Sequence, residues 1–106
     1  MEDKTRYRER FGKTHAKPHD DGDVIWFHAA SIGESLAILP VLFAWQKRHP
    51  YDQLLITTVT KTSAYIMAQR MPKGCIHQYA PFDIYPWVKR FLKHWQPKKL
   101  IIVESE

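Results

Sequence analysis

Four short segments with the composition of β-strands, separated by longer segments with helical spacing, constrain the fold of this chain more than any other feature. They are residues 24–27, 54–58, 75–79 and 100–103. The first two are typical of strands buried on both faces of a sheet. Strands that alternate with helices form a parallel sheet through right-handed crossovers. The sequence therefore predicts an α/β fold, a Rossmann-like parallel sheet with flanking helices.

Each interval between these segments contains a predicted helix. The first covers residues 36–48, and Pro40 is expected to kink it or to delay its regular part. The second covers residues 63–71. The third covers residues 84–95, with Asp83 placed as its N-cap. Its apolar stripe consists of Ile84, Trp87, Val88, Phe91, Leu92 and Trp95.

The expected order of the strands places one crevice at the centre of the sheet. In the usual order 3-2-1-4, the first and fourth strands are neighbours and the chain order reverses between them. Ligands of such sheets bind there, beyond the carboxyl ends of the strands. Glu34 follows the first strand, and Glu104 and Glu106 follow the fourth. We therefore expect carboxylates to flank one ligand crevice.

Glu34 has two interpretations at this position. A glutamate in a crevice can act as a general base toward a hydroxyl nucleophile, and the positive end of a helix favours its ionised form. Gly33 would let a ligand approach the backbone, and exposed amides at the helix start could bind an anion. Ser31-x-x-Glu34 is also the pattern of a capping box, in which Glu34 only satisfies a backbone amide. Spacing alone favours the cap.

Charge is distributed unevenly along the 106 residues, a length that fits one domain. Residues 1–23 hold six basic and six acidic side chains, and we expect a charged, poorly packed lead-in that is compatible with a short helix around residues 4–11. The domain itself is predicted at residues 24–106. Between Ile84 and Val103 there are five Lys and Arg and no acid. A small module that binds nucleic acid or membrane through this segment is an alternative function.

Several classes of site and location are disfavoured by the sequence. Cys75 is the single cysteine, so an internal disulfide is excluded, and it is most simply a core residue. The six histidines have no metal-site spacing, and we expect no metal or cofactor. The longest apolar run, residues 36–45, is far shorter than the ~20 residues that span a bilayer. The chain as given is predicted to be soluble or peripheral.

The run from Ile25 to Glu34, Ile-Trp-Phe-His-Ala-Ala-Ser-Ile-Gly-Glu, resembles the signature of the 3-deoxy-D-manno-octulosonate (Kdo) transferases. Other stretches agree with this family in register. They are Arg10-Phe11-Gly12, Ile56 to Thr62, Pro81-Phe82-Asp83, Arg90-Phe91-Leu92 and Val103 to Glu106. The resemblance extends from about Arg6 to the last residue, which makes it far more specific than any single motif.

The resemblance implies the N-terminal, acceptor-side half of a two-domain glycosyltransferase with the GT-B fold. Such enzymes transfer Kdo from CMP-Kdo to a lipid A precursor in lipopolysaccharide biosynthesis, without a catalytic metal, at the cytoplasmic face of the bacterial inner membrane. By the same resemblance Glu34 is the general base. The residues that it implies in substrate binding are Ser31, Gly33, Thr58, Thr60, Glu104 and Glu106.

The chain also departs from the family pattern. Ser63 stands where the family has Gly, and the N-terminal membrane helix and the donor domain of the family are absent from the sequence. We therefore expect CMP-Kdo to bind through the missing domain and this polypeptide alone to be inactive. The implied partners are the lipid A precursor and the inner-membrane surface, with no nucleic acid. A nonfunctional remnant of a truncated gene is the other alternative.

Overall fold

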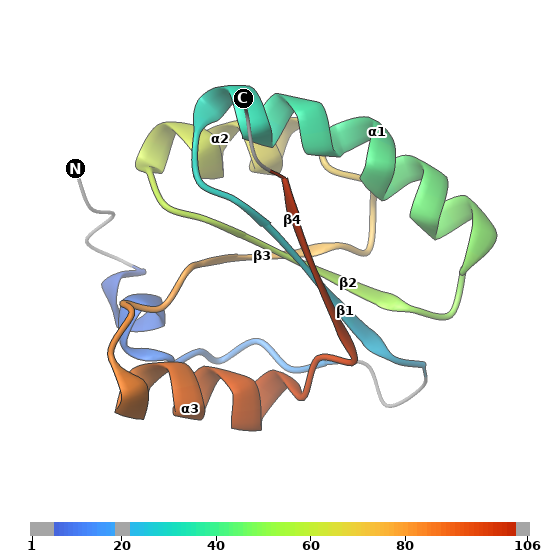
Figure 1. The fold of residues 1–106 in the computed structure, drawn as a ribbon. Helices are drawn as coiled ribbons and strands as arrows, with labels where there is room; N and C mark the ends of the chain where they lie inside the picture. Colours follow the sequence, from blue (N-terminus) through green and yellow to red (C-terminus); the bar gives the residue numbers. More distant parts are fainter. Residues whose placement is uncertain (1–5, 19–21, 104–106) are drawn as a thin grey trace.

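The computed structural model describes residues 6–18 and 22–103 of the chain, and its centre is a four-stranded parallel sheet. The strands lie in the order β3-β2-β1-β4 (Figure 1). Their bounds are β1 Val24–Ala29, β2 Gln53–Thr58, β3 Ile76–Tyr79 and β4 Lys99–Val103. Both the predicted α/β class and the predicted strand order are confirmed.

The strand register fixes the position of the expected crevice. β1 is the central strand that pairs with β2 on one side and β4 on the other, so that His28 lies opposite Thr57 and Ala29 lies opposite Val103. The carboxyl ends of β1 and β4 are therefore adjacent, as the topology predicts for a point where the strand order reverses.

Helices cover both faces of the sheet (Figure 1). Helices α1, Ile32–Arg48, and α2, Lys61–Arg70, lie on one face, whereas α3, Tyr85–Trp95, lies on the other face together with the N-terminal segment. Each face has its own apolar core, because alternate residues of a strand point to opposite sides. The core under α1 and α2 includes Phe27, Ile38, Leu42, Ile56 and Met67. The core under α3 consists of Val24, Leu55, Phe91 and Trp95.

Helix α1 begins earlier than its apolar spacing predicts. Ser31 is its N-cap, and the helix continues through Pro40 to Arg48. The alternative in which the regular helix starts only after Pro40 is wrong, because the cap at Ser31 stabilises the first turn upstream of the proline. Apolar side chains remain exposed on this helix. They are Ile32, Leu36, Val41 and Phe43.

Two details of the prediction for α3 are wrong. The N-cap is Ile84, without a side-chain hydrogen bond, and not Asp83. If Asp83 were the N-cap, Pro86 would be the third helical residue. The side chain of an N-cap accepts from the backbone N–H of the second or third helical residue, and proline has no N–H to donate. Two members of the predicted apolar stripe are also exposed, Ile84 at 49% and Leu92 at 41%.

The N-terminal segment is packed against the sheet, so the expectation of a loose lead-in is wrong for its described part. It contains a short 3-10 helix, η1, at Tyr7–Phe11, and Arg10 within it is only 7% exposed. The Arg10 guanidinium donates to the carbonyl of Val59 and lies 4.7 Å from the ring centre of Tyr79. The backbone carbonyl of Arg10 also accepts a 2.7 Å hydrogen bond from Phe82. These contacts fasten the segment to the carboxyl edge of the sheet.

Candidate functional site at the carboxyl end of β1

Glu34 lies in the first turn of α1, directly after the carboxyl end of β1. The Glu34 amide donates a 3.1 Å hydrogen bond to the Ser31 hydroxyl, and the Glu34 carboxylate accepts a 3.1 Å hydrogen bond from the Ala30 amide. This is the reciprocal arrangement of a capping box, except that the carboxylate accepts from the amide of Ala30 instead of the amide of the N-cap Ser31. The capping interpretation of Glu34 is therefore confirmed, and its role as a base stays a prediction.

Gly33 is exposed beside Glu34 and has no packing role in the fold. A Cβ atom added at Gly33 meets no other atom within 4 Å. Its backbone is helical, since it is the second residue of α1, so no left-handed conformation requires glycine either. The backbone at the helix start is thus open to close approach from outside.

A hydrogen-bonded group of three side chains lies next to Glu34 on the α3 side of the sheet. The indole Nε1 of Trp26 donates to the hydroxyl of Thr57 at 2.8 Å, and that hydroxyl also lies 2.8 Å from Nδ1 of His28. Burial lowers the pKa of His28 below its usual value, and it outweighs the Glu34 carboxylate and a hydrogen bond with the Thr57 backbone, which both act to raise it. The neutral form of His28 is therefore favoured near pH 7, although the negative charge of Glu34 acts in the opposite direction.

A groove of about 380 Å³ opens beside this group. Its walls come from β1, from β4, from the loop after β3 and from α3. The lining is apolar except for His28 and Asp83. The residues that line it are Trp26, His28, Ala80, Pro81, Asp83, Val88, Leu100 and Ile102. Sequence reasoning did not select His28, although two-residue alternation places it on the same face as Trp26.

The threonines predicted at the substrate site lie in two different settings. Thr58 is fully buried, and its hydroxyl lies 2.7 Å from Nε2 of His77 on the neighbouring strand. Thr60 is exposed at the N-cap of α2, where it accepts a 3.1 Å hydrogen bond from the Ser63 amide. The remaining two predicted residues, Glu104 and Glu106, lie outside the described residues.

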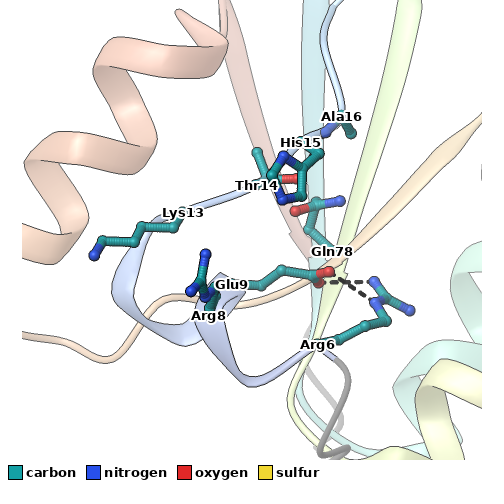
Figure 2. A pocket seen from close by; sticks show the side chains of 8 residues that line it. All are labelled: Arg6, Arg8, Glu9, Lys13, Thr14, His15, Ala16 and Gln78. Carbon is teal, nitrogen blue, oxygen red and sulfur yellow. Dashed lines mark hydrogen bonds and ion pairs between the residues drawn. The ribbon is translucent and has the colours of Figure 1, made fainter.

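A second cavity, of about 500 Å³, lies between the N-terminal segment and β3 (Figure 2). Its lining consists of Arg6, Arg8, Glu9, Lys13, Thr14, His15, Ala16 and Gln78. The dashed lines in Figure 2 mark the ion pair of Arg6 with Glu9, in which the nearest N and O atoms are 2.7 Å apart. Lys13 extends away from the other labelled side chains (Figure 2). None of the residues predicted at the substrate site lines this cavity.

Several basic residues between Ile84 and Val103 have contacts within the chain. Arg90 donates to the carbonyl of Phe11 at 3.0 Å, and Nε2 of His94 lies 2.7 Å from the carbonyl of Ala16. Lys98 lies 3.3 Å from Asp23. Part of the cationic surface of α3 thus holds the N-terminal segment in place, which weakens the alternative of an anion-binding module.

Metal-ligating side chains and membrane-spanning helices also bear on the kind of site. Within residues 6–18 and 22–103 no group of three or more His, Cys, Asp or Glu side chains is arranged to hold a metal ion. Over the same residues no helix has both the length and the apolar character needed to cross a membrane.

The fold and the site together define a class: a Rossmann-like α/β domain with a glutamate at the carboxyl edge of its parallel sheet. The family model described as 3-deoxy-D-manno-octulosonic-acid transferase (kdotransferase) matches residues 5–106. The chain therefore belongs to the Kdo transferase family, and within it to the N-terminal domain.

Curated relatives agree with this family. The 3-deoxy-D-manno-octulosonic acid transferase of Rickettsia felis is 43% identical over 83 residues, which are 78% of this chain and 18% of the relative. The probable mitochondrial transferase of Arabidopsis thaliana is 38% identical over 106 residues, 100% of this chain and 24% of the relative. The Haemophilus influenzae transferase is 31% identical over 95% of this chain and 25% of its own length. The chain thus spans a quarter or less of these relatives.

Proposed function

We propose that this chain is the acceptor-side domain of a GT-B glycosyltransferase of lipopolysaccharide biosynthesis. The reaction is the transfer of Kdo from CMP-Kdo to a lipid A precursor, with the donor bound by a second domain. Glu34 is the general base, and no metal takes part. Membership in the Kdo transferase family supports the reaction, and the position of Glu34 beyond the carboxyl end of β1 supports its role.

The observation that carries the proposal is the open backbone at Gly33. Glycine inside a helix costs about 1 kcal/mol relative to alanine, and neither packing nor conformation at this position requires it. Close approach of a ligand to the helix start, directly beside the Glu34 carboxylate, explains why a glycine stands there.

The base role follows from ordinary carboxylate chemistry. As the acceptor hydroxyl attacks the anomeric carbon of the donor sugar, the bond from that carbon to the phosphate oxygen breaks and CMP leaves with the electron pair. Glu34 takes the proton of the hydroxyl, which raises the nucleophilicity of the oxygen. The capping contact is compatible with this step, because a carboxylate has lone pairs for several hydrogen bonds and the Ala30 amide uses one of them. The same contact holds the carboxylate at the start of α1.

The remaining substrate residues and the membrane are part of the proposal as well. The exposed caps Ser31 and Thr60, and the carboxylates of Glu104 and Glu106, are the other proposed contacts to the acceptor. The exposed apolar side chains of α1 support a proposed contact with the inner-membrane surface or with the second domain.

The test uses a chimaera in which this chain replaces the matching residues of the Rickettsia felis relative. Transfer from CMP-Kdo to a tetra-acylated lipid A precursor is followed by mass spectrometry. Glu34→Gln keeps a side-chain oxygen for the Ala30 amide, so we expect a loss of at least about 100-fold in transfer at an unchanged melting temperature. Asp52→Asn is the matched control: it also converts a carboxylate into an amide, but at the opposite edge of the sheet, where Asp52 accepts from Trp45 at 3.0 Å.

Two results would contradict the proposal. If the wild-type chimaera folds and transfers no Kdo, the proposed reaction is wrong. If Glu34→Gln and Asp52→Asn transfer Kdo at similar rates, the reaction stands and Glu34 is a cap without a role as base.

A further inference from the structure

The amide of Gln78 lines a cavity that contains none of the residues of the proposed acceptor site. This cavity is the space of about 500 Å³ between the N-terminal segment and β3 (Figure 2). Gln78 is only 5% exposed. A buried amide is costly unless both its nitrogen and its oxygen have partners. The contacts of Gln78 therefore indicate what a ligand of the cavity has to supply.

The orientation of this amide follows from the residue before it. The side-chain nitrogen of Gln78 donates to the backbone carbonyl of His77 at 3.0 Å, and a carbonyl can only accept. The oxygen Oε1 therefore points the other way, among the groups that line the cavity (Figure 2). Within residues 6–18 and 22–103, no group donates to Oε1. A buried acceptor without a donor indicates a ligand that provides one.

Thr14 provides a donor at the same cavity. Its hydroxyl oxygen accepts a 3.0 Å hydrogen bond from the Ala16 amide, and this contact leaves the hydroxyl proton unused. In the part of the chain that the structure describes, that proton has no acceptor. A ligand in the cavity thus meets one unused donor on Thr14 and one unused acceptor on Gln78.

The charges that line the cavity favour an anion. Glu9 is compensated by Arg6 at 2.7 Å, and its carboxylate also accepts from the Tyr79 amide at 2.7 Å. The Arg8 guanidinium has no carboxylate partner among the described residues. One positive charge thus remains even without Lys13, which extends away from the other labelled side chains (Figure 2). A phosphate has three oxygens, enough for a bidentate guanidinium and a hydroxyl donor.

We propose that this cavity binds a phosphate ester that carries free hydroxyl groups, either a sugar phosphate or the glycerophosphate head group of a lipid. Arg8 and Thr14 donate to the phosphate, and a hydroxyl of the ligand donates to Oε1 of Gln78. The volume of about 500 Å³ lies within the range of small-molecule sites. The inference goes beyond the proposed function, because the cavity is separate from the proposed acceptor site.

The first measurement identifies the ligand class and its location. Glucose 1-phosphate is titrated into the ¹⁵N-labelled chain and followed by ¹H–¹⁵N spectra, with glucose and inorganic phosphate as matched controls. We expect saturable shifts of the Gln78 side-chain amide signals, and at least about 10-fold weaker binding of either control. Vesicles of phosphatidylglycerol are compared in parallel with vesicles of phosphatidylcholine, whose head group has no hydroxyl. Binding to phosphatidylglycerol vesicles without binding to glucose 1-phosphate would identify a lipid head group as the source.

Two substitutions test the assigned contacts. Arg8→Gln removes the charge at an exposed position and should weaken binding at least about 10-fold, whereas Arg48→Gln, also exposed, is the matched control and should change it less than about twofold. Gln78→Met keeps the length of the side chain without its amide and should weaken binding about 3- to 10-fold. Gln46→Met is the control for this change, because the Gln46 amide donates to the carbonyl of Lys73 on the other face of the sheet.

Three results would overturn the inference. If neither glucose 1-phosphate nor the phosphatidylglycerol vesicles bind, the cavity holds only water. If inorganic phosphate binds as tightly as glucose 1-phosphate, the hydroxyl contact with Gln78 does not exist. If Arg8→Gln and Arg48→Gln bind equally well, the ligand lies elsewhere, and this comparison is decisive even where Gln78→Met does not fold. Transfer of Kdo by the chimaera is measured separately, so the proposed function stands or falls independently of these results.

Discussion

The guanidinium of Arg6 donates to the side chain and the backbone of His77 together. Its Nη2 atom lies 3.0 Å from Nδ1 of the imidazole and 2.9 Å from the His77 carbonyl oxygen. Arginine can only donate, so Nδ1 of His77 must accept and Nε2 carries the proton that is donated to Thr58 at 2.7 Å. Both ring nitrogens are thus used by a neutral imidazole, and a protonated ring would lose the contact with Arg6.

This relationship predicts a loss of stability in mild acid. Burial and the Arg6 charge lower the pKa of His77 to about 3 from a usual value of 6.5. Between these values the unfolded chain binds a proton that the folded chain does not, so the free energy of unfolding falls as the pH decreases from 6.5 toward 3. The contribution of His77 should make the free energy of unfolding, measured by chemical denaturation, about 2–3 kcal/mol lower at about pH 4.5 than at pH 7.

The control for the acid prediction is His77→Asn. Its side-chain oxygen can accept from Arg6 and has no proton to gain in this range, so the difference between the two pH values should shrink by about the same 2–3 kcal/mol. An unchanged difference in the variant would assign the acid sensitivity to other groups.

A second prediction concerns Gly12, which ends η1 in the left-handed conformation with φ of 76°. A Cβ atom at this position would lie 2.4 Å from the carbonyl oxygen of Trp87, which belongs to the backbone of α3 and cannot move aside easily. Gly12→Ala combines backbone strain with this clash and should lower the free energy of unfolding by at least about 2 kcal/mol. Denaturation followed by tryptophan fluorescence measures it; a variant as stable as the wild type would show that η1 does not pack on α3 in solution.

Local patterns in the sequence predicted the elements of the sheet, because apolar runs and helical spacing reflect burial directly. The four strands, their order and the position of Glu34 at a strand end all follow from such patterns. The same holds for the Ser31–Glu34 cap, whose two residues are three positions apart.

Long-range partners explain what the sequence could not predict. The charge pattern places Arg10 in a charged, poorly packed lead-in, whereas its guanidinium binds the carbonyl of Val59, 49 positions away. The family resemblance implies Thr58 in substrate binding, whereas its buried hydroxyl pairs with His77, 19 positions away. A single sequence does not reveal which polar side chain finds a distant partner, since that depends on the register of neighbouring strands and on how η1 crosses the sheet edge.

Cys75 gives a prediction about reactivity. Burial raises the pKa of its thiol to about 11 from a usual value of 9.0, so the thiolate that reacts with alkylating agents is about 100-fold scarcer at pH 8 than in the unfolded chain. Mass spectrometry after treatment with iodoacetamide should show slow modification in buffer and rapid modification in denaturant. Equal rates in the two conditions would mean that the loop before β3 opens readily.

The last prediction separates stability from function at Gly33. Since an added Cβ meets no atom within 4 Å, Gly33→Ala should leave the free energy of unfolding unchanged or raise it by up to about 1 kcal/mol, through the higher helix propensity of alanine. If a ligand approaches the helix start closely, the same methyl group occupies its space, and transfer by the chimaera should fall at least about 10-fold. Gly12→Ala provides the contrast, because there the methyl group acts on the fold itself. If the Gly33→Ala chimaera transfers Kdo at the wild-type rate, no ligand approaches the backbone at Gly33 closely, and the proposed acceptor site loses its main support. A large loss of stability would show instead that the start of α1 is packed against other residues.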